Sequence, residues 1–208
     1  MRVLIGTTNP SKVGRFKEIL RGYDIEFLTL SDLNISDEPL ENGRTPKENA
    51  VIKAEFYGKY FDAVICNDSG LYFDSLPLDD ERQPGLHIRS PKGKRLDDEE
   101  MIEYYSDLVN SLGGRVLAYY LDGMAVFNNG CVTSFMGSRE DVRVGSFYLI
   151  DKPSDKRHVG WPLDSISVNR DSGKYFVDLS QNETAQSQII VGEYAEHIKD
   201  FLVKSLKL

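Results

Sequence analysis

Cysteine, clustered cations and long hydrophobic runs are all scarce in this sequence of 208 residues. Its two cysteines, Cys66 and Cys131, stand in apolar surroundings without a Cys-x-x-Cys spacing or a nearby histidine, so the favoured interpretation is two buried, reduced thiols. The first apolar run, Val3 to Ile5, is far too short for a signal peptide or a membrane span. We therefore expect a cytoplasmic protein with no membrane partner.

The charge balance also argues against one class of partner. The chain carries 25 basic and 33 acidic residues and no long block of lysine and arginine, so a nucleic-acid polymer is not expected to bind it. A small phosphorylated ligand needs only a few local cations and is compatible with this composition. The length suits one α/β domain, or two closely joined lobes, with a proper buried core.

The stretch from Ala63 to Leu71 is the most informative part of the chain. Its apolar first half predicts a buried strand, and the Asn-Asp-Ser-Gly sequence at 67–70 predicts that the strand ends there. Open α/β sheets bind ligands at the carboxyl edges of their strands, so Asp68 and Ser69 are candidate site residues. Taken alone, the same residues are also typical of an ordinary turn.

A strand, a polar loop and a helix open the chain. Residues 2–6 predict a short buried strand, and the apolar spacing predicts a helix over 12–21, with Ser11 or Asn9 as its N-cap. The loop hydroxyls, the helix N-terminus and Lys12 offer an anion several donors and one cation. Ordinary helix capping explains the same residues, and the loop lacks the glycines of a Walker motif.

The next helix has the clearest start signal. Thr-Pro-Lys-Glu at 45–48 predicts a capping box with proline at the first helical position, and an apolar face follows. Lys53 lies near the middle of this helix, and Glu41 lies in the polar segment before it. Lys53 alone carries no functional claim, because a lone mid-helix lysine is usually solvated.

The second half of the chain is rich in predicted strands. Asn-Asn-Gly at 128–130 is a strong hairpin signal and joins two strands expected over 115–127 and 131–135. The only tryptophan, Trp161, lies on a loop between glycine and proline, where it is either a packing plug or a platform for stacking a base. The pattern also predicts helices over about 97–112 and 193–206 and strands over about 141–150 and 173–179.

Four stretches of the chain follow the order of motifs in one protein family. Residues 7–12 resemble its Thr-x-Asn-x-x-Lys loop, and residues 41–54 resemble its Glu-x-Gly-x-Thr-x-x-Glu-Asn-Ala-x-x-Lys-Ala element. Residues 67–71 are similar to its Asp-Asp-Ser-Gly-Leu, and residues 160–166 match in part its Gly-Phe/Trp-Gly-Tyr-Asp-Pro-Ile. The family is that of the inosine triphosphate pyrophosphatases, which hydrolyse ITP, dITP and XTP to monophosphate and pyrophosphate.

Several positions depart from the family pattern. Asn67 replaces the first aspartate of Asp-Asp-Ser-Gly, and Arg15 stands where the family has an acid. Residues 84–89 are a shortened likeness of Pro-Gly-x-x-Ser-Ala-Arg. The family's Ser-His-Arg, which helps to hold the purine, is represented at best by Ser-Gln-Ile at 187–189. The resemblance therefore implies a retained phosphate half of the site and an altered base half.

Cleavage between the α- and β-phosphates explains why such residues are needed. Water must reach a phosphorus atom surrounded by negative oxygens, so a divalent metal and nearby cations have to offset that charge. The resemblance makes Asp68 the general base, makes Lys53 and Lys12 the cations that neutralise the triphosphate, and makes Glu41 and Asp68 the ligands of Mg²⁺ or Mn²⁺. It also implies that Trp161 stacks on the base and that Asp164 accepts a hydrogen bond from it. The other substrate-binding candidates are Thr7, Thr8, Asn9, Lys12, Ser69 and Gln188.

The resemblance and the predicted elements lead to one fold and one function. We expect an α/β fold with a mixed sheet flanked by helices and two lobes around a central cleft, forming one domain over 1–208 with a β-rich second lobe at about 72–150. Family members are generally dimers, so a homodimer is expected. The predicted function is hydrolysis of ITP-, dITP- and XTP-like nucleotides with altered base recognition. The open alternatives are a pyrophosphatase for a pyrimidine or modified nucleotide, and a nucleotide-binding protein with little turnover.

Overall fold

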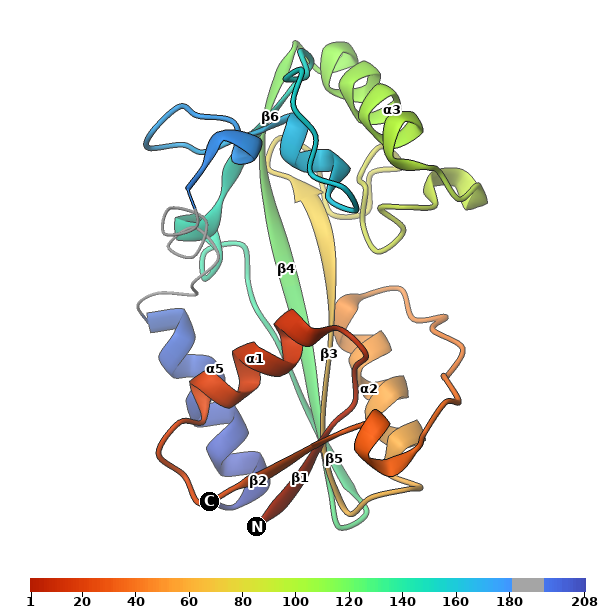
Figure 1. The fold of residues 1–208 in the computed structure, drawn as a ribbon, viewed down its shortest axis with the longest axis vertical. Helices are drawn as coiled ribbons and strands as arrows, with labels where there is room; N and C mark the ends of the chain where they lie inside the picture. Colours follow the sequence, from red (N-terminus) through yellow and green to blue (C-terminus); the bar gives the residue numbers. More distant parts are fainter. Residues whose placement is uncertain (181–192) are drawn as a thin grey trace. The chain divides into compact units, whose positions relative to one another are not determined.

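The computed structural model describes residues 1–180 and 193–208, and the chain forms two compact units. Strands β3 (Ala63–Phe73) and β4 (Arg115–Asn128) each contain residues of both units (Figure 1). Unit 1 comprises Met1–Ser69, Leu121–Ser138 and Val191–Leu208, and unit 2 comprises Gly70–Tyr120 and Arg139–Ile190.

Unit 1 combines parallel and antiparallel strand pairs. β1 (Arg2–Ile5) pairs in parallel with β2 (Glu26–Thr29) and with β3, whereas β4 pairs antiparallel with β5 (Cys131–Met136). The predicted hairpin is confirmed: Asn129 and Gly130 have φ values of 48° and 82°, as a two-residue turn between twisted strands requires. The helices described in this unit are α1 (Pro10–Ile19), α2 (Pro46–Tyr57) and α5 (Glu193–Leu206).

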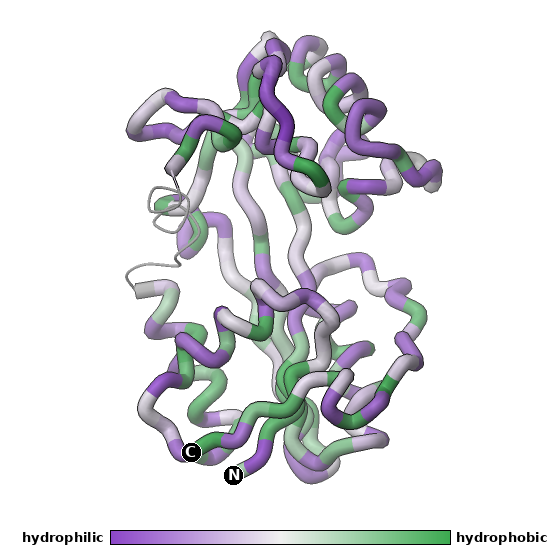
Figure 2. Tube along the Cα trace, in the orientation of Figure 1, coloured by the Kyte–Doolittle hydropathy of each residue, from purple (hydrophilic) through white to green (hydrophobic). Residues whose placement is uncertain are grey.

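The core of unit 1 joins the strands to one face of α2. Hydrophobic residues follow the strands of this unit in Figure 2. Leu4, Val64 and Cys66 are at most 1% exposed and belong to one cluster with Ala50 and Ala54 of the helix. Burial of these apolar side chains fixes α2 against β3, and so fixes the polar residues that the same two elements carry.

Unit 2 packs a long helix against antiparallel strands. β4 pairs antiparallel with β6 (Phe147–Ile150), which pairs in the same sense with β7 (Ser167–Val168). Helix α3 (Asp98–Ser111) starts with a complete capping box between Asp97 and Glu100, and its buried face contributes to a separate hydrophobic core. The 3₁₀ turns described in the chain are η1 (Ser31–Leu33), η2 (Pro91–Gly93), η3 (Arg143–Gly145), η4 (Pro162–Ser165) and η5 (Phe176–Asp178).

These elements confirm the predicted α/β class with a mixed sheet. Among the described residues, hydrogen bonds link seven strands in the order β2-β1-β3-β4-β6-β7, with β5 beside β4. The extent of the domain and the central cleft stay predictions. Within the same residues, no helix has both the length and the apolar composition that crossing a bilayer requires.

The prediction that the 63–71 strand ends at its polar residues is wrong. β3 continues to Phe73, and Leu71 and Gly85 exchange backbone hydrogen bonds of 3.0 and 2.8 Å within unit 2. A Cβ atom on Gly70 would lie 2.8 Å from the ring of Tyr72, so the glycine serves close packing inside a strand and not a turn. Asp68 and Ser69 therefore project from the middle of a strand, where alternation sends their side chains to opposite faces.

Two other predicted strands are shorter or absent. β6 begins only at Phe147, because the carbonyl of Arg143 accepts side-chain hydrogen bonds from Ser146 and Arg170, which favour a 3₁₀ turn over a strand there. Residues 173–179 contain η5, and only Tyr175 makes an isolated bridge to a strand. Alternation of apolar residues did not separate these turns from true strands.

One predicted thiol environment is also wrong. Cys66 is buried as expected, but Cys131 is exposed. Cys131 directly follows the hairpin turn on β5, which in the described part of the chain pairs only with β4. An edge strand beside a turn leaves its first side chain in solvent even where the neighbouring sequence is apolar.

Candidate active site

Lys53 lies between two carboxylates in unit 1. Its Nζ is 2.7 Å from Oε2 of Glu41 and 3.7 Å from Oδ1 of Asp68. The side chains of Lys53 and Asp68 are only 15% and 16% exposed, so their attraction is less weakened by water than that of a surface pair. A helix, a strand and a loop thus bring three of the predicted site residues into one cluster.

Asn49 organises this cluster and was not predicted as a site residue. Its Nδ2 donates a 2.8 Å hydrogen bond to Oδ2 of Asp68, and its Oδ1 accepts a 2.8 Å hydrogen bond from the backbone N–H of Gly43. It therefore fixes the Asp68 carboxylate and ties down the loop that carries Glu41. The available signal was a polar side chain one turn before Lys53 on the apolar face of a helix, where such residues need a partner.

The start of α2 holds the same loop from its other side. Thr45 Oγ1 accepts the backbone N–H of Glu48 at 3.1 Å, and Pro46 occupies the first helical position, as predicted. The reciprocal half of the predicted capping box is wrong, because the Glu48 carboxylate accepts the N–H of Arg44 at 2.7 Å and not that of Thr45. This hydrogen bond therefore reaches one residue further than a capping box would, and it fixes Arg44, the residue before the N-cap.

Helix α1 places a second lysine near this cluster. Burial, followed by the positive charge of Lys53, lowers the pKa of Lys12, while the negative charges of Asp68 and Asp122 oppose the shift. Among the described residues, no carboxylate forms an ion pair with Lys12. A partly buried cation in this setting is electrostatically ready for an anion.

The loop before α1 is used mainly for capping. Asn9 is the N-cap: its Oδ1 accepts the backbone N–H groups of Ser11 and Lys12 at 2.9 and 3.4 Å. Thr7 Oγ1 accepts the N–H of Asn9 at 3.2 Å, and Thr8 is exposed. These contacts satisfy two of the helix N–H groups within the protein, so Lys12 and the helix dipole carry most of the attraction that this loop offers to an anion.

The two departures from the family pattern in this region have clear structural positions. Arg15 Nη2 donates to Oδ2 of the buried Asp122 at 2.8 Å and so joins α1 to β4. Asn67 is 1% exposed, and neither polar atom of its amide has a hydrogen-bond partner among the described residues. Because adjacent residues alternate along β3, the Asn67 side chain lies on the face opposite Asp68.

Unit 2 carries the residues predicted to bind a base. Trp161 is 57% exposed, and Oδ2 of Asp164 lies 3.0 Å from Nδ1 of His158. Burial raises the pKa of Asp164, and the hydrogen bond with His158 opposes that rise. Gln188 lies outside the described residues.

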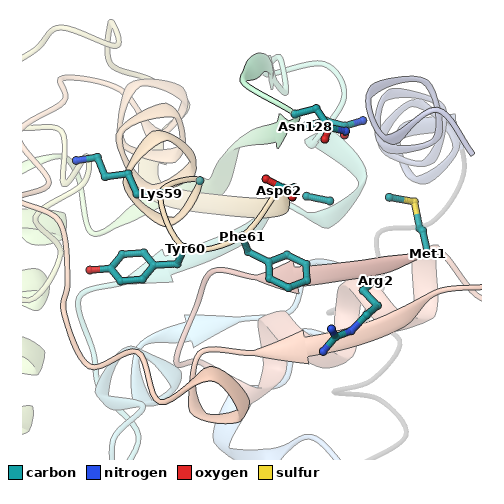
Figure 3. Close-up of a pocket in the computed structure, with 10 residues that line it drawn as sticks. Met1, Arg2, Lys59, Tyr60, Phe61, Asp62 and Asn128 are labelled. Atoms are coloured by element: carbon teal, nitrogen blue, oxygen red, sulfur yellow. The ribbon is translucent and has the colours of Figure 1, made fainter.

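A surface pocket in unit 1 lies away from these residues along the strands. It has a volume of about 370 Å³ and opens beside Met1, Arg2 and Phe61, with the Arg2 guanidinium 5.7 Å from the centre of the Phe61 ring (Figure 3). Ala63 also lines it and is the first residue of β3. Asp68 lies five residues further along the strand, or about 17 Å at the usual rise, so this pocket is not the predicted site.

The donor set of the cluster suits a metal ion that is shared with a substrate. Among residues 1–180 and 193–208, no three histidine, cysteine or acidic side chains gather as an all-protein metal site would need. Glu41 and Asp68 do supply two carboxylates around one point, the Nζ of Lys53. Mg²⁺ is usually held by one or two carboxylates together with substrate phosphates and water, so these residues fit it.

The sequence of the chain matches one known family. The model of the Ham1 family matches residues 3–187 of this chain. The chain belongs to the Ham1 family. The predicted resemblance to the inosine triphosphate pyrophosphatases is thereby confirmed at the level of the family.

Relatives of the Ham1 protein described here cover most of its length. A dITP/XTP pyrophosphatase of Bacillus subtilis (strain 168) is 32% identical over 184 residues, which are 86% of this chain and 86% of that protein. A dITP/XTP pyrophosphatase of Thermoanaerobacter pseudethanolicus is 29% identical over 206 residues, 98% of this chain and 94% of that protein.

Solved structures agree with the fold of this Ham1 chain. The Ham1 protein of Staphylococcus aureus has a TM-score of 0.70 at 26% identity and covers 98% of this chain and 99% of its own. A HAM1 protein from Coxiella burnetii has a TM-score of 0.72 at 21% identity with the same coverage, which supports the fold alone.

Proposed function

We propose that this Ham1 protein hydrolyses non-standard purine nucleoside triphosphates, with dITP and XTP as the model substrates. The relatives named dITP/XTP pyrophosphatases support this assignment, and nothing in the comparisons favours the pyrimidine or binding-only alternatives. The observation that carries the proposal is the Asp68 carboxylate, held by Asn49 and facing Lys53, in a chain of this family.

The bond cleaved in this proposal lies between the α- and β-phosphates, so the products are a monophosphate and pyrophosphate. Asp68 takes a proton from the attacking water, and its hydrogen bond from Asn49 limits the orientations of the carboxylate. Lys53 and Lys12 offset the charge that builds up on the departing pyrophosphate. Thr7, Thr8, Asn9 and Ser69 are proposed as further contacts of the phosphates or sugar.

A divalent metal is part of the proposed chemistry. Bound Mg²⁺, or Mn²⁺, would offset the negative charge of the phosphate oxygens, and Glu41 and Asp68 would hold it. Lys53 forms ion pairs with both carboxylates, so it holds Glu41 and Asp68 near each other in the free enzyme. Like charges placed this near are tolerated only beside a cation.

The proposed contacts to the base are fewer than those to the phosphates. Trp161 offers a stacking face and Asp164 an acceptor, while Gln188 stands where the family has histidine. Stacking on an aromatic face is worth about 1–3 kcal/mol for any base, so discrimination must come from polar contacts. We also expect a homodimer, as in the family generally.

The test is pyrophosphate release from ITP, dITP, XTP, ATP and dTTP, measured with Mg²⁺ and again with excess EDTA. We expect pyrophosphate from ITP, dITP and XTP with Mg²⁺ and none with EDTA. Release of orthophosphate in place of pyrophosphate would move the cleavage to another bond. Nucleotide binding without any release would favour the binding protein that the sequence left open.

A further inference from the structure

Arg15 and Asp122 form a largely buried ion pair between α1 and β4 in unit 1. Nη2 of Arg15 lies 2.8 Å from Oδ2 of Asp122, and the two side chains are 23% and 10% exposed. Phe16, the next residue of the helix, is fully buried and holds α1 in place beside this pair. Nε of Arg15 is also buried, and it has no hydrogen-bond partner among the described residues. The guanidinium is therefore turned toward β4, where Asp122 supplies the compensating charge.

Lys12 lies one turn before Arg15 on the same side of α1. Residues three apart on a helix are neighbours, so the two cations stand side by side. The negative charge of Asp122 reaches Lys12 as well, because it opposes the lowering of the Lys12 pKa that is caused first by burial. The positive charge of Arg15 adds to that lowering. Two cations thus lie near one buried carboxylate, and Arg15 is the one that holds it.

The neighbouring polar residue on this side of the sheet is uncharged. Gly123 faces α2, because a Cβ atom there would lie 2.1 Å from the backbone of that helix, so alternation turns Asp122 to the other face. Asn67 lies on that other face too, opposite Asp68, which α2 holds. The amide of Asn67 offers Arg15 no competing anion. The charge of Arg15 is therefore committed to Asp122.

A buried carboxylate needs a cation beside it. Removing one member of a buried pair leaves the other charge without compensation from water or protein. Without Arg15, Lys12 is the cation of α1 that can take its place, because Lys17 is exposed and Lys12 has a flexible four-carbon stem. An ammonium held by Asp122 would no longer be available to a phosphate.

We infer that Arg15 is a positioning residue: by holding Asp122, it leaves the ammonium of Lys12 available to the phosphates of the substrate. The inference rests on the proposed function, since it concerns the phosphate half of that site. Arg15 acts through Lys12 and does not itself contact the substrate. The inference also gives a role to an arginine at a position where the family pattern has an acid.

The experiment compares wild type with Arg15→Met, alone and combined with Asp122→Asn, and with Lys12→Met, alone and combined with Arg15→Met. Methionine keeps the apolar part of either side chain and removes its charge. Lys17→Met, which removes a positive charge from an exposed position of α1, is the matched control. Kinetics of ITP hydrolysis and calorimetric binding of inorganic pyrophosphate are measured with Mg²⁺, and thermal melts report the fold.

We expect Arg15→Met to lower both kcat/KM for ITP and the affinity for pyrophosphate by about tenfold, the scale of one hydrogen bond to a charged group. Adding Asp122→Asn should restore both to within about twofold of wild type, because no carboxylate then draws Lys12 away. In the Lys12→Met protein, Arg15→Met should cause no further loss, as expected of a residue that acts through Lys12.

A loss in Arg15→Met that persists with Asp122→Asn would overturn the inference, because Arg15 would then contact phosphate itself or only join α1 to β4. Wild-type values in Arg15→Met, or an equal loss in Lys17→Met, would overturn it as well. If Arg15→Met does not fold, Arg15→Gln takes its place in every comparison. Its amide can still donate to Asp122 but carries no charge, and recovery with Asp122→Asn decides the outcome in the same way.

Pyrophosphate binding separates the inference from the proposed function. If wild type hydrolyses ITP and Arg15→Met matches it in both measurements, the inference fails and the function stands. If no nucleotide is hydrolysed but pyrophosphate binding falls and recovers as described, the proposed function fails and the role of Arg15 in phosphate binding stands. If wild type neither hydrolyses ITP nor binds pyrophosphate, both are overturned.

Discussion

The two units present their candidate residues in opposite ways. In unit 1, Lys53 and Asp68 are about five-sixths buried and project from a helix and a strand that share a hydrophobic core. In unit 2, Trp161 is 57% exposed on a loop that is anchored by ion pairs at the surface. The residues proposed to act on the triphosphate, which all substrates share, are thus set in rigid elements, while the residues proposed to contact the variable base are set on a turn.

The largest expected effect is in unit 1. Asp68→Asn should reduce kcat by about a hundredfold or more, the usual scale for losing an acid-base group, because the amide cannot take a proton from water. The fold should persist, since asparagine has nearly the same shape and keeps an acceptor for Asn49. Steady-state pyrophosphate release and a thermal melt measure the two effects. Asp62→Asn, an exposed change at the residue before β3, is the control, and near-normal kcat in Asp68→Asn would remove Asp68 from the mechanism.

The next effect concerns the buried hydrogen bonds behind Asp68. Asn49→Ala leaves the N–H of Gly43 and one Asp68 oxygen without their partner and should destabilise the fold by about 1–3 kcal/mol. Because the Asp68 carboxylate would then no longer be held in one orientation, kcat should also fall by roughly tenfold. Chemical denaturation and kinetics measure both, with the exposed Asn110→Ala of α3 as control. Unchanged stability and kcat would show that Asn49 does not organise the cluster.

A smaller effect should appear in the pH profile. Burial and Lys53 lower the pKa of Lys12 from its ordinary 10.5, so Lys12 loses its charge at a lower pH than a solvated lysine. As the pH rises, kcat/KM should therefore begin to decline at a pH below 10.5, because the neutral amine of Lys12 no longer attracts phosphate. Lys12→Arg stays charged and should move the decline to higher pH. An alkaline limb identical in both proteins would separate Lys12 from phosphate binding.

The smallest effect is expected at the anchor of the unit 2 loop. Asp98→Ala removes the partner of Arg89 and of the Gly160 N–H, both at the surface. Exposed pairs contribute little, so KM for ITP should rise by about fivefold or less with kcat unchanged. Kinetics on Asp98→Ala and on Asp107→Ala, a later position of α3, would check this. A loss as large as that of Asp68→Asn would contradict the contrast between the two units.

The sequence correctly predicted helix starts and tight turns that depend only on neighbouring residues. The Thr45 cap with Pro46 and the Asn129-Gly130 turn lie where predicted, because each signal acts through its own backbone. The end of β3 was misplaced because Asn-Asp-Ser-Gly has the composition of a turn, while packing between distant residues, such as Leu71 and Gly85, extends the strand. Asn49 was missed as a site residue for the same reason: its partner Asp68 lies 19 residues further along the chain, and only the folded chain brings the two side chains together.

The exposed Cys131 gives this protein a chemical handle. Burial raises the pKa of the Cys66 thiol to about 12, so near neutral pH that sulfur is both enclosed and unionised, while the thiol of Cys131 is accessible. A maleimide dye should therefore mark one atom per chain without any engineering. Because that atom lies on the edge strand β5, energy transfer between donor- and acceptor-labelled chains would report self-association in dilute solution, where the expected homodimer has to form.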